Sequence, residues 1–222
     1  MSDHAHLALR LEGPLQSWGY ESQFNRRQTG PLPTKSALLG LCAAAMGLAK
    51  GSADEAAMLP RLAELRCLVL ALNRPGAAGF ATARLEDYHT VQNTRTADGK
   101  IKATHLTRRD YLTDARFLGL LSGERLLAQR VSAALQDPVW GVWLGRKACI
   151  PSAPVFAGLF DSEADALAAL LGGEPIDAFT RQREVAAFAE GTDSLPDQPL
   201  SFAIPRAFAP RRVRRREAGQ AE

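Results

Sequence analysis

Alternating apolar and polar segments predict a strand, a loop and a helix at the start of the chain. The segment His6–Leu11 has the length and apolar content of a short strand, and a polar, basic loop follows at Ser22–Gly30. A second apolar run begins behind Thr34, whose hydroxyl can accept a hydrogen bond from a free N–H group at a helix N-terminus. The pattern therefore predicts a helix over Thr34–Ala49.

The following segments continue an α+β pattern up to residue 138. Strand, helix, two strands, helix and strand follow one another in the order of a ferredoxin-like (RNA-recognition-type) domain, with a long polar segment inserted between the middle strands. We expect a short helix in Gly51–Arg61, strands at Leu65–Leu72, Phe80–Leu85 and Tyr111–Leu121, and a helix at Glu124–Leu135.

The rest of the chain reads as a small β-rich part, residues 139–205, followed by a tail. After Pro205 the sequence is basic and interrupted by proline, so residues 206–222 are expected to be disordered. The expected elements before it are strands at Val139–Leu144 and Val155–Phe160, an alanine-rich helix at Glu163–Leu171, and a hairpin pairing Glu184–Ala189 with Leu200–Ile204.

Charge is distributed unevenly on a chain whose composition is otherwise ordinary. The 222 residues are 46% hydrophobic and 23% charged, which is typical of a globular protein, and the modest formal net charge of +3 says little about partners. Tyr88–Arg109 nevertheless holds five Lys and Arg residues against the single acid Asp98, and Arg206–Arg216 holds six arginines and no acid. Such local blocks indicate a directed surface for a polyanion.

The three cysteines and the absence of long apolar runs indicate an intracellular protein without a metal site. Cys42, Cys67 and Cys149 are far apart and lack the spacing of metal ligands. Cys42 and Cys67 lie in apolar runs, so buried free thiols are expected. No signal-peptide pattern or membrane-spanning run is present, which predicts a cytoplasmic location, no membrane partner and no cofactor.

The first loop and helix together form a candidate phosphate site. Free N–H groups and the helix dipole would face an anion at the N-terminus of the helix, and Lys35 adds a full charge. Arg26 and Arg27 lie in the loop just before it. Trp18 and Tyr20 are close in sequence; both could stack on bases, and Trp18 could equally fill the core.

The segment Asp87–Asp110 is too long for a turn and too polar for the core. Asp98-Gly99 favours a tight hairpin turn, and Thr, Val and Ile residues alternate with the cations around it. We interpret the segment as a projecting β-hairpin, stabilised by a polyanion that relieves repulsion between its cations; the alternative is a flexible solvated loop. The arms carry the polar residues Gln92, Asn93, Arg95, Lys100, Lys102 and His105.

Four motifs, in order along most of the chain, resemble those of the CasD family, a subunit family of the type I-E CRISPR surveillance complex Cascade. The resemblance fades after about Pro175, so no role is transferred to the basic tail. The matching motifs are Gly13-Pro14-Leu15-Gln16-Ser17-Trp18-Gly19 with Pro33-Thr34-Lys35-Ser36-Ala37-Leu38-Leu39-Gly40-Leu41, then Asp87-Tyr88-His89-Thr90-Val91, Arg109-Asp110-Tyr111-Leu112-Thr113-Asp114-Ala115, and Leu144-Gly145-Arg146-Lys147-Ala148-Cys149 with Pro154-Val155-Phe156.

The resemblance implies a non-catalytic RNA-binding subunit with a β-hairpin thumb at about 87–110. Such a subunit holds the 5′ handle of the CRISPR RNA, caps the hexameric backbone beside the large PAM-recognising subunit, and meets target DNA only indirectly through the complex. Single-stranded RNA is gripped by cations, backbone amides and stacking groups. The implied RNA-binding residues are Arg26, Arg27, Gln28, Lys35, Ser36, Gln92, Asn93, Arg95, Lys100, Lys102, His105, Arg108, Arg109, Arg146 and Lys147.

Two other functions remain open from the sequence. A related type I-C branch cleaves repeat RNA, and metal-independent cleavage needs an acid and a base, commonly histidine. His89 and His105 are the candidates here, with Tyr88 and Lys102 in support, although the adjacent Lys-His pair expected of that branch is missing. A generic RNA-recognition module, indifferent to the handle sequence, is the third possibility.

Overall fold

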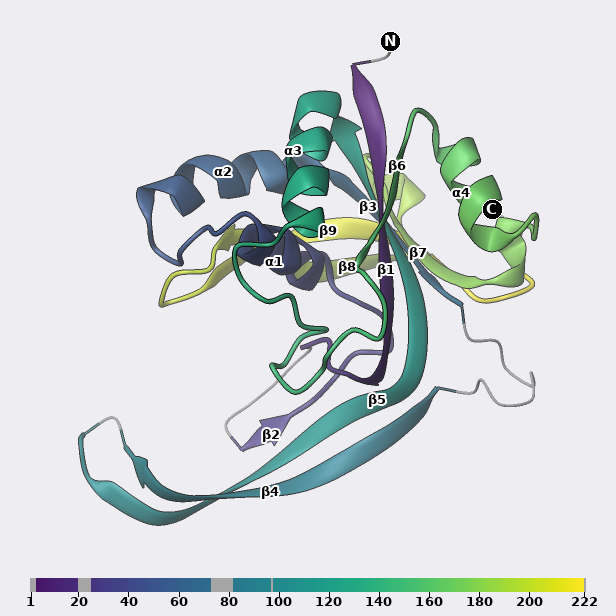
Figure 1. The fold of residues 1–222 in the computed structure, drawn as a ribbon. Helices are drawn as coiled ribbons and strands as arrows, with labels where there is room; N and C mark the ends of the chain where they lie inside the picture. The colour runs from purple at the N-terminus through teal and green to yellow at the C-terminus, as the bar shows by residue number, and fades with distance from the viewer. Residues whose placement is uncertain (1–2, 20–24, 73–81, 97, 222) are drawn as a thin grey trace.

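A computed structural model describes residues 3–19, 25–72, 82–96 and 98–221 of the chain as helices packed on a mainly antiparallel sheet (Figure 1). The elements are β1 (His4–Gln16), β2 (Arg26–Arg27), α1 (Lys35–Ala45), α2 (Ala53–Glu64), β3 (Arg66–Ala71), β4 (Ala83–Arg95), β5 (Ile101–Glu124), α3 (Arg125–Gln136), β6 (Phe156–Phe160), α4 (Glu163–Leu171), β7 (Thr180–Glu184), β8 (Asp193–Ser201) and β9 (Ala207–Arg216), with short 3-10 turns at Ile176–Ala178 and Phe188–Glu190.

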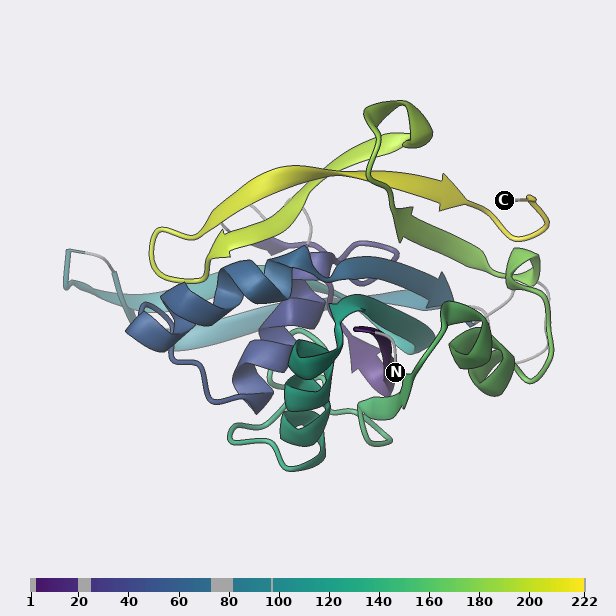
Figure 2. The same ribbon diagram turned by 90° about the horizontal axis from the view of Figure 1, so that it is seen from above.

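The sheet runs in the order β6-β1-β5-β3-β7-β9-β8, with β2 and β4 both paired to the outer part of β5. Its two faces are covered by different helices (Figure 2). Leu7 and Leu9 of β1 lie in the larger core beneath α1, α2 and α3, whereas Leu68 and Leu70 of β3 lie in a smaller core beneath α4. A strand buried on both faces is continuously apolar, which explains the Leu/Val run in β3.

The first helix begins where its capping signal predicts. The Oγ1 atom of Thr34 accepts a hydrogen bond from the Ala37 N–H at 3.3 Å. The predicted strands around β1 and β3 and the helices at α1, α3 and α4 are likewise confirmed. Trp18 is fully buried and donates its indole N–H to Gln16 at 3.1 Å, so it fills the core; Tyr20 lies outside the described residues.

The C-terminal third differs most from expectation. Residues 139–144 form no strand, and β8 pairs with β9 where a hairpin between residues 184–189 and 200–204 was expected. The predicted disordered tail is wrong, because Ala207–Arg216 is a strand between β7 and β8. Its inward residues Arg211 and Val213 are buried. The sheet also continues across the predicted boundary at residue 138, since β6 lies beside β1.

Four buried or nearly buried charges hold the C-terminal strands against α1. Asp197 on β8 accepts two hydrogen bonds from Arg211 on β9, at 2.6 and 3.0 Å, and a third from the Lys35 backbone N–H at 2.8 Å. The Lys35 ammonium donates to Glu184 on β7 at 3.0 Å and to the carbonyl of Ala63 at 2.7 Å. Two cations thus face two anions, which allows Arg211 of a basic strand to be buried.

Candidate nucleic-acid interface

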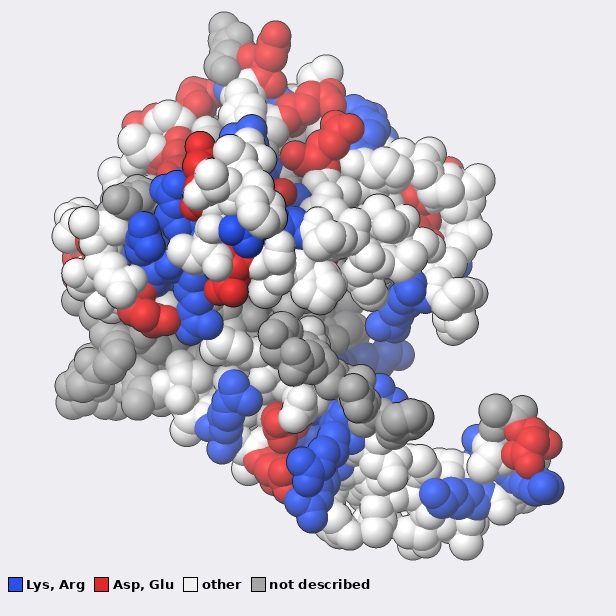
Figure 3. Space-filling model, turned by 180° about the vertical axis from the view of Figure 1, so that it is seen from behind, with Lys and Arg blue, Asp and Glu red and all other residues white. Residues whose placement is uncertain are grey.

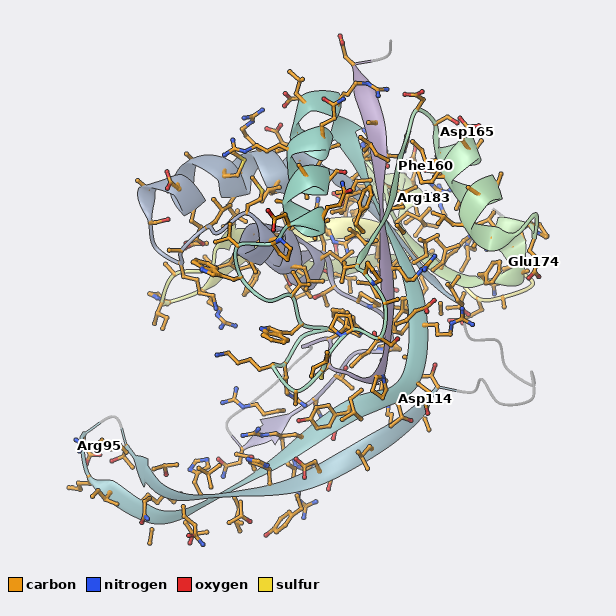
Figure 4. The ribbon with its side chains drawn as sticks, viewed as in Figure 1. Arg95, Asp114, Phe160, Asp165, Glu174 and Arg183 are labelled. Carbon is orange, nitrogen blue, oxygen red and sulfur yellow. The ribbon has the colours of Figure 1, made fainter. Side chains whose placement is uncertain are left out.

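A long hairpin made by β4 and β5 projects from the body of the protein and curves beneath it, with its tip turned back up in the view of Figure 1. The two strands pair in a continuous antiparallel register from Ala83 opposite Thr113 to Arg95 opposite Ile101. Arg95 lies near the tip (Figure 4). The turn closes through a hydrogen bond from the Thr96 N–H to the carbonyl of Lys100 at 2.9 Å. The segment 87–110 therefore forms two extended arms.

Most of the polar residues anticipated on the arms are accessible to solvent. The backbone is irregular at Asn93, which has a φ of +52° in the left-handed region. His105 is half-buried. The exposed members of the set are Gln92, Asn93, Arg95, Lys100 and Lys102. Nearer the base, Arg108 is exposed and Arg109 is half-buried.

The base of the hairpin gathers arginines from two distant parts of the sequence. β2 pairs in parallel with β5, which places Arg26 beside Arg108 and Arg27 beside Arg109. The exposed Arg108 is 3.4 Å from the carboxylate of Glu86. Lys and Arg side chains gather close to where the hairpin joins the body and again at its tip (Figure 3). Several cations so close together attract a polyanion.

Arg146 holds this arrangement together from the loop between α3 and β6. Its guanidinium lies 4.6 Å from the ring centre of Tyr111 and donates hydrogen bonds to the carbonyls of Asp110, at 2.8 Å, and Arg27, at 2.6 Å. The group anticipated as a direct RNA contact is thus engaged in fixing β2 against β5. Lys147, the next residue, is exposed.

Lys35 does not contact solvent, so its assignment as a phosphate contact is wrong. Its side chain is 0% exposed, because it supplies a cation to Glu184 inside the protein. The α1 N-terminus, where a phosphate was expected, receives the carboxylate of Asp197. The helix end therefore attracts an anion as the sequence predicts, but that anion belongs to the chain. Ser36 is half-buried and lines a groove beside α1.

This groove has a volume of about 780 Å³ and contains residues that were not singled out from the sequence. It lies between α1, the loop that follows α3, and the β8–β9 hairpin, and it also reaches Arg27 and Gln28. The available signal is a pair of tryptophans within four residues, in a segment for which the sequence predicts a strand. The newly found lining residues are Lys50, Trp140, Trp143, Phe202, Arg206 and Phe208.

The four residues considered for RNA cleavage are not brought to one place. The register sets His89 opposite Thr107, two residues along β5 from His105, so the two histidines are diagonal neighbours on one face of the hairpin. Tyr88 and Lys102 occupy strand positions on the opposite face, because side chains alternate along a strand. The arrangement thus separates the histidines from their supposed supports.

The thiols are poorly suited to nucleophilic chemistry. Burial raises the pKa of Cys42 and that of Cys67 to about 12, and burial also raises the pKa of Cys149. Each of the three is free and buried, as expected for the first two. In the described part of the chain, no cluster of three or more His, Cys, Asp and Glu side chains could hold a metal ion. Nor does any described helix have the length and hydropathy to cross a membrane.

Similarity to known proteins extends over nearly the whole chain. Residues 6–214 match the family model described as "CRISPR-associated protein (Cas_Cas5)". The chain is 33% identical over 219 residues to "CRISPR system Cascade subunit CasD" of Escherichia coli (strain K12), covering 93% of each protein. Its fold matches a chain of a "CRISPR RNA-guided surveillance complex" with a TM-score of 0.74, 30% identity, and coverage of 96% of this chain and 90% of the other.

A second solved structure, titled "Crystal structure of Cas protein", gives a TM-score of 0.69 at 34% identity and covers 96% of this chain and 94% of that one. Sequence and fold therefore agree over the same span, which includes both the sheet and the projecting hairpin. The chain belongs to the CasD family of CRISPR-associated proteins.

Proposed function

We propose that this chain is a non-catalytic subunit of a Cascade complex and that it holds the 5′ handle of the CRISPR RNA. The relative from E. coli is named as a Cascade subunit, and it matches this chain along almost its full length. The series β1-α1-β3-β5-α3-β6, whose four strands are neighbours in the sheet, supports a ferredoxin-like unit of the kind that binds RNA.

The proposal rests on the arginine cluster at the base of the hairpin. Arg26 and Arg27 are more than 80 residues from Arg108 and Arg109 in sequence, yet the fold aligns them side by side. Because side chains alternate along a strand, Arg26 and Arg108 share one face and Arg27 and Arg109 share the other. Phosphate groups of a single strand bent around the base of the hairpin are the anions that these guanidinium groups would bind. Polar neighbours such as the exposed Gln28 would then read base edges.

The hairpin itself supplies a thumb that presses on the guide where the handle meets the spacer. Its length and exposure suit a contact with a long RNA and with the last copy of the backbone subunit. We assign the neighbouring position to the large PAM-recognising subunit, with target DNA reached only through the assembled complex. A ribonucleoprotein of this kind would work in the cytoplasm.

Charge reversal of Arg26 and Arg27 to Glu tests the assignment. We expect at least roughly tenfold weaker binding of handle-bearing RNA, because phosphate contacts dominate such affinities. A matched control reverses the exposed Arg66 and Arg130, which lie on β3 and α3 away from the hairpin. Equal affinities for the two double variants would refute the proposed site.

An endoribonuclease remains the second candidate, because His89 and His105 are diagonal neighbours. His89 Nδ1 also lies 3.4 Å from a carboxylate oxygen of Asp87, a pairing that could orient an imidazole. Incubation of the full chain with repeat RNA in EDTA separates the two functions. Intact RNA with a retarded band on a native gel supports handle binding, whereas a discrete cut at the handle boundary that disappears in His89→Ala or His105→Ala establishes cleavage.

A further inference from the structure

The groove beside α1 is lined by small residues on one side and by aromatic residues on the other. Small residues of α1, Ala37, Gly40 and Ala44, line one side and leave room for a flat ring. Trp140 and Trp143 lie among the residues that line the remainder, together with Phe202 and Phe208 from the β8–β9 hairpin. The volume of about 780 Å³ is that of a site for an organic ligand rather than for an ion.

The two groove tryptophans are accessible to solvent, unlike the third tryptophan of the chain. Trp140 is 45% exposed and Trp143 is 37% exposed. Among the residues that the structure describes, neither indole N–H has a hydrogen-bond acceptor, whereas that of the buried Trp18 donates to Gln16. Large aromatic side chains left open in this way are typical of surfaces that bind a partner.

The charges around the groove favour an anionic partner. Arg27, Lys50 and Arg206 are exposed, and their side chains form no ion pair with any described residue. Asp197 is the sole acid among the described lining residues, and its carboxylate is already held by Arg211 and by the backbone N–H of Lys35. The ligand therefore has to offer both flat apolar surface and negative charge.

We propose that this groove binds unstacked bases of single-stranded RNA, with Trp140 and Trp143 as the stacking surfaces and Lys50 and Arg206 as phosphate contacts. The inference rests on the proposed function, because the strand would enter from the arginine cluster at Arg27. An apolar peptide of a partner protein would also cover the rings, but it would leave three cations without counter-charges. Bases linked by phosphates satisfy the rings and the cations together.

The test compares Trp140→Ala/Trp143→Ala with the conservative Trp140→Phe/Trp143→Phe pair. The probe is a single-stranded RNA with the repeat-derived handle, bound to the full chain. Loss of one stacked base lowers affinity roughly 5-fold to 150-fold, so the alanine pair should lose at least that much while the phenylalanine pair stays close to wild type. Leu126→Ala, which removes a 71% exposed side chain from α3, is the matched control and should have no effect.

Two further measurements keep the test independent of folding. RNA should quench the tryptophan fluorescence of the wild-type chain, because Trp140 and Trp143 are accessible and Trp18 is not. Abasic substitution through the handle should identify a position that weakens binding to wild type but not to the alanine pair. Unquenched fluorescence with bound RNA, or abasic effects that are the same in both proteins, would overturn the inference.

Failure of this inference and failure of the proposed function give different results. If the alanine pair binds as wild type while the Arg26→Glu/Arg27→Glu variant does not, the groove is not the base site and handle binding stands. If both variants bind as wild type, the arginine-cluster site is refuted as well. If the alanine pair binds RNA normally but no longer assembles with the other subunits, the groove binds protein and the inference is wrong.

Discussion

Replacing Lys35 with methionine removes one charge from the buried group of four that joins α1 to the C-terminal strands. Lys35 is 0% exposed and Glu184, its partner at 3.0 Å, is 17% exposed, so the carboxylate left behind remains largely shielded from water. Removal of one partner from a buried ion pair destabilises a protein by about 3–5 kcal/mol. The methionine has a similar length, so the variant changes charge more than packing.

The lower end of that range applies here, because Glu184 keeps two other interactions. It still accepts the Cys67 backbone N–H at 3.1 Å and lies 3.8 Å from a guanidinium nitrogen of Arg211. We therefore expect Lys35→Met to lower the free energy of unfolding by about 3 kcal/mol. For a chain of this length the midpoint of thermal unfolding would fall by roughly 6–12 °C.

Urea unfolding of the full chain measures the change, since a shift of midpoint at constant slope reports stability. Arg61→Met is the matched control: it breaks an ion pair to Glu124 whose partners are 47% and 49% exposed, and the expected loss is about 0–1 kcal/mol. Adding Glu184→Leu to Lys35→Met should recover part of the stability, because replacing a whole buried pair by apolar groups is often neutral.

Two results would contradict this reasoning. One is a Lys35→Met variant as stable as Arg61→Met, which would show that the buried charges contribute little. The other is unchanged stability with weakened RNA binding, which would restore the phosphate contact that the sequence suggested. Below its unfolding transition, the variant should bind handle RNA as the wild type does.

Three further outcomes follow from single positions. Gly145→Ala should strongly destabilise the fold, since the residue has a φ of +99° and a Cβ atom would lie 1.7 Å from a backbone carbonyl oxygen. Gly19→Ala should not, because the new Cβ atom would meet no atom of the described residues within 4 Å; thermal unfolding compares the two variants. Cys42 and Cys67 should resist a thiol reagent at neutral pH until the chain unfolds, because burial raises each pKa to about 12; rapid labelling of the native chain would disagree. Burial lowers the pKa of His6 below its ordinary 6.5, so its contribution to stability is complete above that pH and declines as the pH falls. His6→Gln should therefore flatten the stability profile below about pH 6.5, which urea unfolding at several pH values measures.

Local sequence patterns predicted the helices and strands whose conformation is set by residues close to one another in the chain. The short apolar segment His6–Leu11, the apolar run at Leu65–Leu72 and the cap at Thr34 each specify one conformation through nearby residues, and β1, β3 and α1 form there. The cations of the segment Asp87–Asp110 could be located from the sequence for the same reason. A hairpin turn and two arms are local features.

Other outcomes depended on partners that lie far away in sequence. Arg211 in isolation indicates a solvated tail, and only the carboxylate of Asp197, brought beside it by the β8–β9 pairing, allows its burial. Lys35 in isolation indicates an anion site, and only the fold reveals that Glu184 on β7 pairs with its ammonium group. The sequence around a charged residue does not reveal which oppositely charged residue will pair with it in the fold.

The sequence by itself thus determined the family, the order of the main elements and the basic character of the hairpin, because these depend on motifs and short-range periodicity. Tertiary structure alone decided which cations remain free for a ligand, since that depends on long-range pairing. It aligned Arg26 and Arg27 with the base of the hairpin, and it placed Trp140 and Trp143 on one groove with Arg206. Both sites form only in the folded protein, because tertiary packing brings together residues that are far apart in the chain.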